Sequence, residues 1–191
     1  YDKCLPGGNW PSTLLQLTSD NTLKSMRVKN SFIRLPQSFD VDQLVTELNS
    51  FGEQCWMEHP SKMAGNSALP LISYSGERNH KFEGQMLPTE YLAKASYIRQ
   101  VMASFGEVLS RSRLMRLAPG AEVSEHVDFN YHWLSRVRIH VPIKTNTEVT
   151  FHCGENRVHM APGEAWLFDS WRRHRVINAG KEDRIHLVID L

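Results

Sequence analysis

The sequence is short of cysteine, of excess charge of either sign and of long apolar runs. Its three cysteines, Cys4, Cys55 and Cys153, are widely spaced and none belongs to a CxxC pair, so we expect reduced thiols rather than a disulfide framework. The 22 basic and 21 acidic side chains leave a net charge of +1. Binding to nucleic acid or to an anionic membrane surface calls for clustered positive charge. We therefore expect neither as a partner.

Apolar stretches are too short to cross a bilayer. No run approaches the roughly 20 residues that a transmembrane helix needs, and the N-terminus, which begins at Tyr1, lacks the basic and apolar segments of a secretion signal. We therefore expect a soluble, cytoplasmic protein. Its 191 residues, 41% hydrophobic and 23% charged, are typical of one globular domain with a full core.

The first part of the chain predicts an arm followed by supporting helices. Turn-forming residues dominate its beginning, whereas apolar residues recur at helical spacing after Asp40, a suitable N-cap, and again after Pro88. The expected elements are an irregular arm over 1–30, a helix over 41–51, a mainly irregular stretch over 52–88 with one strand at 69–74, and a second helix over 89–109.

Beyond Ser110 the chain changes to short apolar or alternating runs separated by turns. The expected strands cover 113–117, 137–143, 148–151, 157–160, 165–168, 175–177 and 185–189. Many short strands with such turns predict an all-β sandwich or barrel, and we expect a mainly β jelly roll with helices packed outside it. Residues 1–110 are assigned to the arm and supporting helices and 111–191 to a core that carries the chemistry, together forming one structural domain.

Two histidines and one aspartate are the candidate metal ligands. His126 and Asp128 are two residues apart, so in an extended segment they project to the same side. Alone, such a pair is more often a surface or hydrogen-bonded pair. His174, however, opens a later predicted strand, and two histidines with one carboxylate form the facial triad that leaves coordination positions of non-haem iron(II) open. A 2-oxoacid and dioxygen would fill those positions.

Arg184 is the candidate partner for a carboxylate. It comes ten residues after His174, across the turn 178–180, so we expect it on the next strand of a hairpin and close to the metal. A guanidinium offers a planar fork that matches a carboxylate, such as the distal end of 2-oxoglutarate. From the spacing alone, a surface arginine at the start of a strand would be the better interpretation.

Strand alternation places polar side chains together on one face. Arg138 and His140 alternate with aliphatic residues over 136–143, and Arg184 and His186 do the same over 184–190. In a jelly roll one face of each strand lines the interior. These polar faces therefore either line a ligand site or meet solvent, and alternation alone leaves both possibilities open.

The second half of the chain resembles the aspartyl/asparaginyl β-hydroxylase family. It is also similar to bacterial cis-4-proline hydroxylases of the same superfamily, in which an HxD pair, a distal histidine and a later arginine hold matching places. The order and spacing agree across about 80 residues. The motifs that carry the resemblance are Arg116–Gly120, Glu125–Asp128, Arg138–Ile143, Pro162–Trp166, His174–Asn178 and Arg184–Asp190.

The resemblance implies a double-stranded β-helix of the cupin-like class and a dioxygenase that uses iron(II), 2-oxoglutarate and O2, with ascorbate as a supporting reductant. The implied reaction hydroxylates an unactivated carbon and releases succinate and CO2. Arg138 and His140 match family positions that contact 2-oxoglutarate. The animal enzymes hold iron without a carboxylate, whereas this chain keeps Asp128. That difference weakens the transfer of their protein-domain substrate and argues against a halogenase.

The resemblance also favours an amino acid, a peptide residue or an amino-acid-like small molecule as substrate. Asn130, His132 and Trp133 follow the metal pair closely, and Arg78 lies in a polar loop over 75–81, so these four are the candidate substrate contacts. Loop packing, or a solvated loop for Arg78, is the competing interpretation. His59, His80, His152 and His159 lie outside the motifs, and we interpret them as surface or packing residues.

Two other functions fit the same fold. A cupin-like isomerase or hydrolase uses a histidine-rich metal site in a jelly roll without an oxoacid, and it has no need of the arginines Arg138 and Arg184. A non-catalytic binding domain keeps the fold but is expected to have a damaged ligand set, whereas His126, Asp128 and His174 are all present.

Overall fold

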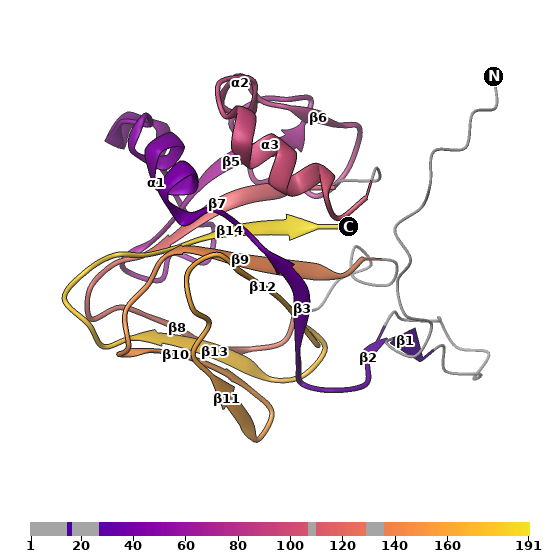
Figure 1. Cartoon of the computed structure of the whole chain (residues 1–191), viewed down its shortest axis with the longest axis vertical. Helices are drawn as coiled ribbons and strands as arrows, with labels where there is room; N and C mark the ends of the chain where they lie inside the picture. Colours follow the sequence, from indigo (N-terminus) through magenta and orange to yellow (C-terminus); the bar gives the residue numbers. More distant parts are fainter. Residues whose placement is uncertain (1–14, 17–26, 107–109, 129–135) are drawn as a thin grey trace.

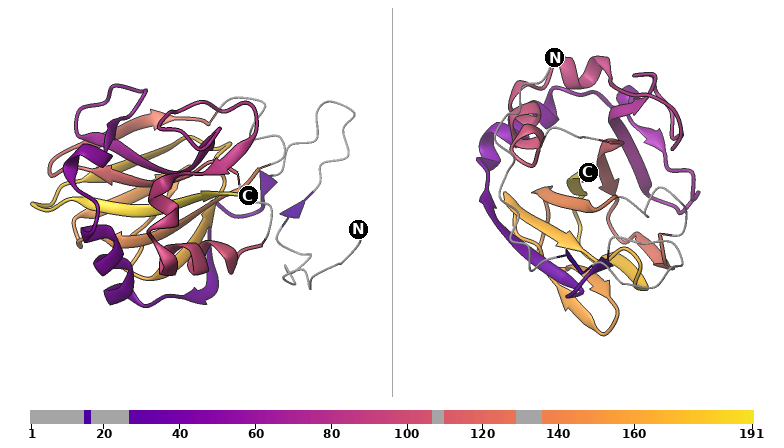
Figure 2. Two further views of the ribbon diagram at one scale, coloured as in Figure 1. Left: turned by 90° about the horizontal axis from the view of Figure 1, so that it is seen from above. Right: turned by 90° about the vertical axis from the view of Figure 1, so that its right-hand side faces the viewer.

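The computed structural model describes residues 15–16, 27–106, 110–128 and 136–191, and its main feature is a pair of antiparallel sheets. Figure 1 shows the larger sheet above the smaller one, with the helices on the outer side of the larger sheet. The end-on view in Figure 2 shows the strands wrapped around a common interior. This arrangement confirms the mainly β, double-stranded β-helix fold with flanking helices.

The large sheet has eight strands and the small sheet has four. In spatial order, the large sheet contains β3 (Phe32–Ser38), β12 (Glu164–Phe168), β9 (Arg138–Lys144), β14 (Arg184–Asp190), β7 (Ser112–Leu117), β5 (Asn66–Tyr74) and β4 (Met57–Glu58), with β6 (Met86–Pro88) paired to β5. The small sheet contains β11 (Asn156–Val158), β10 (Val149–Cys153), β13 (His174–Asn178) and β8 (Glu122–His126). A separate pair joins β1 (Leu15–Gln16) and β2 (Arg27–Val28).

Strands from both parts of the chain build the large sheet. β3 pairs with β12 and β5 pairs with β7, although the sequence assigned no strand to residues 32–38 and a shorter one to 69–74. β8 was likewise expected only as an extended segment. The segment before residue 110 therefore contributes strands as well as helices to the fold.

The alternating strands of the large sheet divide polar from apolar side chains. Ile139, Val141 and Leu187 are fully buried in the core that the sheet shares with the helices. Their neighbours on the opposite face, His140 and His186, are 6% and 1% exposed. These polar side chains therefore lie inside the barrel, which is the first of the two possibilities that alternation left open.

Helix α1 (Val41–Asn49) forms as predicted. The Asp40 carboxylate accepts a hydrogen bond from the Gln43 backbone N–H at 3.1 Å, which satisfies one of the free donors at the helix N-terminus. Leu44 and Leu48 face the core. The helix ends before Gly52, as the sequence indicated.

The single helix predicted over 89–109 is wrong: it is divided into α2 (Glu90–Ala93) and α3 (Ser96–Ala103). Ala95 between them is extended, with φ −114° and ψ 80°. The Glu47 carboxylate of α1 accepts from the backbone N–H groups of Tyr97 at 2.7 Å and Ile98 at 2.8 Å. This carboxylate from another helix caps the N-terminus of α3, so a new helix starts there. The apolar periodicity alone could not reveal the break.

The hairpin expected between His174 and Arg184 is also wrong. β13 pairs with β10 and β8, whereas β14 pairs with β7 and β9 in the other sheet. Asn178, fully buried at the crossover, donates from its side-chain amide to the carbonyls of Leu117 at 3.0 Å and Glu182 at 2.8 Å. These bonds hold the chain where it leaves one sheet for the other.

We expect Leu44→Ala to lower the free energy of unfolding by about 2–5 kcal/mol, the usual cost of a core leucine truncated to alanine. Leu44 is fully buried between α1 and the large sheet. Leu87→Ala is the matched control, because Leu87 is 38% exposed and surface substitutions usually change stability by less than about 0.5 kcal/mol. Urea denaturation measures both, and similar losses in the two variants would contradict this description of the core.

Two further expectations concern thiols and membranes. Cys55 and Cys153 are free thiols, as expected, and Cys4 lies outside the described residues. None of the helices in the described ranges is long and apolar enough to cross a membrane.

Candidate metal centre

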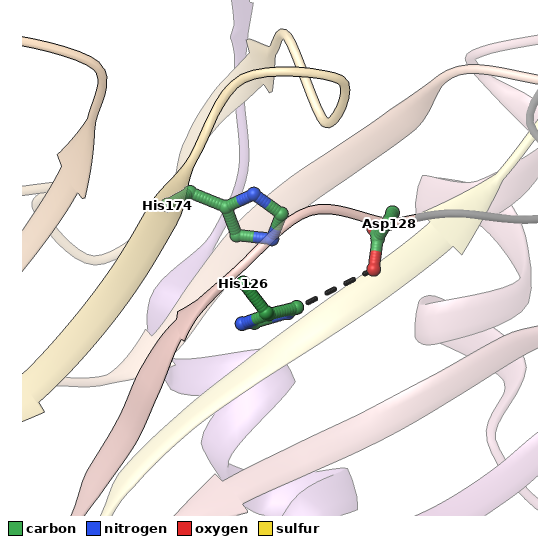
Figure 3. A group of neighbouring side chains, drawn as sticks. All are labelled: His126, Asp128 and His174. Atoms are coloured by element: carbon green, nitrogen blue, oxygen red, sulfur yellow. Dashed lines mark ion pairs between the residues drawn. The ribbon is translucent and has the colours of Figure 1, made fainter.

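Two neighbouring strands and the segment that follows one of them bring three side chains together. β8 pairs with β13 so that His126 lies opposite His174, and their ring centroids are 4.2 Å apart. Asp128 follows two residues after His126, and Figure 3 shows the three side chains turned toward one another. One ligand atom from each lies within 4.8 Å of the others. This set could hold a metal ion.

Backbone carbonyls orient both imidazoles. His126 Nδ1 lies 2.8 Å from the Ser124 carbonyl oxygen, and His174 Nδ1 lies 2.9 Å from the Arg172 carbonyl oxygen. Because a carbonyl only accepts, each Nδ1 carries the proton and each Nε2 keeps a lone pair for a metal. Burial lowers the pKa of His174 to about 4, so that this imidazole is neutral near pH 7.

Asp128 accepts a hydrogen bond from an arginine that also binds a second carboxylate. Arg138 Nη1 donates to Asp128 Oδ2 at 3.0 Å, while its Nε and Nη2 donate to the two carboxylate oxygens of Asp190 at 2.8 and 3.1 Å. Burial lowers the pKa of Arg138, but Asp190 and Asp128 outweigh it and raise that pKa. Asp128 Oδ1 lies 3.8 Å from His126 Nε2. One oxygen of Asp128 is thus fixed and the other is directed toward the imidazoles.

A cavity of about 190 Å³ adjoins the three side chains. Its lining includes polar residues from both sheets and from the connection before β5. Besides the triad, the charged or imidazole side chains that line it are His59, Arg111, Arg113, Arg138, His140 and Arg184.

Arg184 is a buried cation for which the described residues offer no acidic partner. Its side chain comes from the first residue of β14 and is 4% exposed. Nη2 lies 2.8 Å from His186 Nδ1 and 3.5 Å from His140 Nδ1, and Nε has no hydrogen-bond partner. Burial lowers the pKa of Arg184 to about 9, which leaves it charged near pH 7. No carboxylate of the described residues lies within ion-pair distance. Because a buried unpaired charge is costly, an anion bound in the cavity would stabilise this arginine.

Most of the chain matches one known protein family. A profile of the aspartyl/asparaginyl β-hydroxylase family matches residues 55–191. The chain belongs to this family. A search of curated protein sequences finds no match.

Solved structures similar to this family member share its fold. A 2-oxoglutarate–iron(II) oxygenase family oxidoreductase from Burkholderia pseudomallei has a TM-score of 0.59 at 14% identity, covering 84% of this chain and 83% of that one. A Pseudomonas putida prolyl-4-hydroxylase gives 0.58 at 14% identity, with 85% and 92% covered. A collagen prolyl hydroxylase of Paramecium bursaria Chlorella virus-1, solved with 2-oxoglutarate, gives 0.52 at 10% identity, with 85% and 96% covered.

The cavity of this hydroxylase-family chain contains most of the side chains singled out in the sequence. His126, Asp128, His174, Arg138, His140 and Arg184 all line it. His140 is buried beside Arg184, whereas the guanidinium of Arg138 is directed onto the two aspartates rather than standing free.

Of the four candidate substrate contacts, the structure describes Arg78. Arg78 is exposed, donates to the Trp56 carbonyl at 3.5 Å and does not line the cavity. Asn130, His132 and Trp133 lie outside the described residues.

Three of the charged or imidazole residues that line the cavity were not predicted as site residues. His59, which we interpreted as a surface or packing residue, lines the cavity together with Arg111 and Arg113. The two arginines stand two residues apart, so strand alternation could have placed them on one face with Met115. The position of His59 carried no such signal, because a loop brings it to the strand.

Proposed function

We propose that the protein is an iron(II)- and 2-oxoglutarate-dependent dioxygenase that hydroxylates an unactivated carbon of an amino acid, a peptide residue or an amino-acid-like small molecule. The observation that carries the proposal is one cavity that holds two histidines, one carboxylate and a buried arginine to which the described residues offer no counter-ion. Family membership supports a hydroxylase in particular.

The donor set fits iron(II). His126, Asp128 and His174 would hold the metal through two imidazole nitrogens and one carboxylate oxygen, a facial triad that leaves positions for other ligands. With 2-oxoglutarate and O2, bound iron(II) supplies the oxidising chemistry of hydroxylation, and the co-substrate leaves as succinate and CO2. Ascorbate would serve as a supporting reductant.

The rest of the cavity fits the co-substrate. Arg184 would bind the distal carboxylate of 2-oxoglutarate, because its Nε lacks a partner and a guanidinium binds carboxylates through parallel hydrogen bonds. His140 and His186 flank the Arg184 guanidinium and orient it. Their pKa values are held well below the usual range by burial and by Arg184. They therefore stay neutral and leave the arginine as the local charge.

We expect purified protein supplied with iron(II), ascorbate and 2-oxoglutarate to form succinate when an accepted amino acid or peptide is added, and to consume O2 in step. Succinate and O2 are measured across a panel of free amino acids and peptides. Chelation of the metal should abolish both signals. Substrate conversion without the oxoacid would indicate a cupin-like isomerase or hydrolase, and absence of turnover with every panel member would contradict the hydroxylase.

A further inference from the structure

Two more arginines face the cavity from the strand next to β14. Arg113 on β7 and Arg111 just before it are each 3% exposed and line the cavity. The sheet register places Arg113 beside Val188, which in turn lies beside His140 on β9. Arg113 therefore projects into the same interior as the candidate metal ligands.

The neighbours of the two arginines differ. Arg111 has a carboxylate near it, since its Nε lies 3.8 Å from Asp190 Oδ2, and its guanidinium lies 3.7 Å from the centre of the Phe82 ring. For Arg113 the described residues provide a hydrogen bond of 3.3 Å from Nη1 to His59 Nε2 and no ion pair. Burial, followed by Arg113, lowers the pKa of His59 to about 3. His59 therefore accepts the hydrogen bond as a neutral group and contributes no charge.

The charges around the cavity do not balance. Among the described residues, the cavity lining contains one carboxylate, that of Asp128, and four arginines, Arg111, Arg113, Arg138 and Arg184. Asp190 does not line the cavity but lies within ion-pair distance of Arg111 and Arg138. Arg138 binds both aspartates, so two of the four cations, Arg113 and Arg184, have no carboxylate within ion-pair distance among the described residues. Burying an unpaired charge is costly. Since the described part of the chain offers neither site a carboxylate, a bound anion would neutralise each of these charges.

Arg113 and Arg184 lie apart along the direction of the strands. Arg113 pairs in register with Val188, four residues from Arg184 along β14, which corresponds to roughly 13 Å of strand. Arg184 contacts His140 and His186, whereas Arg113 contacts His59. They share no contact that would direct both onto one carboxylate group.

We infer that the substrate carries a carboxylate and that Arg113 binds it, at the level of the cavity away from Arg184. The inference rests on the proposed function, in which Arg184 is occupied by the co-substrate. A carboxylate suits the planar guanidinium fork, with His59 steadying Nη1. The group is either the α-carboxylate of a free amino acid or the side-chain carboxylate of an acidic residue in a peptide. Substrates without an anionic group at this place are rejected, because they leave Arg113 buried and unpaired.

Binding without turnover tests the inference. Protein loaded with Mn(II) and 2-oxoglutarate in the absence of O2 is titrated calorimetrically with free L-amino acids and their carboxamides, and with terminally blocked aspartate and glutamate against blocked asparagine and glutamine. We expect at least one acid to bind about 10-fold or more tightly than its matched amide, the scale of one charge-assisted pair. The first set reports an α-carboxylate and the second a side-chain carboxylate.

Variants assign the effect to Arg113. Arg113→Met should reduce acid affinity to that of the amide and leave 2-oxoglutarate affinity unchanged, while Arg113→Lys should retain part of the preference. Arg116→Met is the matched control, because Arg116 lies on the opposite face of β7, paired with Glu53 and outside the cavity. Its acid affinity should equal that of the wild-type protein.

Several results would overturn the inference. Equal binding of acids and amides to the wild-type protein, or no acid binding at millimolar concentrations, would do so without any variant. Unchanged acid affinity in folded Arg113→Met would remove Arg113 from the site. Loss of 2-oxoglutarate binding in place of acid binding would assign Arg113 to the co-substrate. Failure of the proposed function is separate, since it appears as absence of metal-dependent 2-oxoglutarate binding, and acid titration of the metal-free protein still reports on Arg113.

Discussion

Alanine at His126, Asp128 or His174 is expected to abolish 2-oxoglutarate turnover while the protein stays folded. Each residue would provide one of the three candidate ligand atoms found in the described ranges, which lie within 4.8 Å of one another. Loss of one leaves too few donors to hold iron(II) in an open site. Removing a residue that merely orients a ligand typically costs 10- to 100-fold, so removing a ligand should cost at least about 100-fold in metal affinity.

Metal affinity by competition with a chelator and succinate formation measure this effect, and the melting temperature reports whether each variant is folded. His152→Ala is the matched control, since His152 lies on β10 of the same small sheet but is not among the cavity-lining residues. It should bind metal and turn over normally. Wild-type turnover in any of the three ligand variants would remove that residue from the proposed centre.

The parts of the fold that the sequence predicted are those determined by local chemistry. The Asp40 cap and the apolar spacing after it are contained within one helix, and short alternating runs between turns predicted most strands of the barrel. The break before α3 depends instead on Glu47 of another helix. The placement of β13 and β14 in different sheets depends on Asn178, whose bonds reach residues as far as 61 positions away. Such tertiary bonds leave no periodicity in the sequence.

The candidate site also has features that local sequence predicts and features that depend on tertiary bonds. His126, Asp128 and His174 could be selected by residue type and spacing, and the structure brings them together. Arg138 could be placed on an inward face, but its attachment to Asp128 and Asp190 joins residues up to 52 positions apart. The spacing of the sequence could not show this attachment, and contact of Arg138 with 2-oxoglutarate stays a prediction.

Burial explains why Arg184 should be difficult to replace, even by another cation. A lysine carries its charge on one ammonium group and cannot form two parallel hydrogen bonds to a carboxylate. We expect Arg184→Lys to weaken 2-oxoglutarate binding by about 1.5–3 kcal/mol, the range for lost charge-assisted hydrogen bonds. That range corresponds to roughly 10- to 150-fold in affinity.

The structure adds a second reason for a large effect. The Arg184 guanidinium is positioned by Nη2 against His186 at 2.8 Å, which leaves Nε without a protein partner. A lysine has one nitrogen for both tasks, so contact with the imidazole competes with contact with the co-substrate. Titration of 2-oxoglutarate into Mn(II)-loaded protein without O2 measures the affinity directly, and Arg157→Lys, an exposed arginine on β11, is the matched control. Equal affinity in the two variants would mean that the distal carboxylate is bound elsewhere, and Arg184 would then remain a buried cation in need of a different anion.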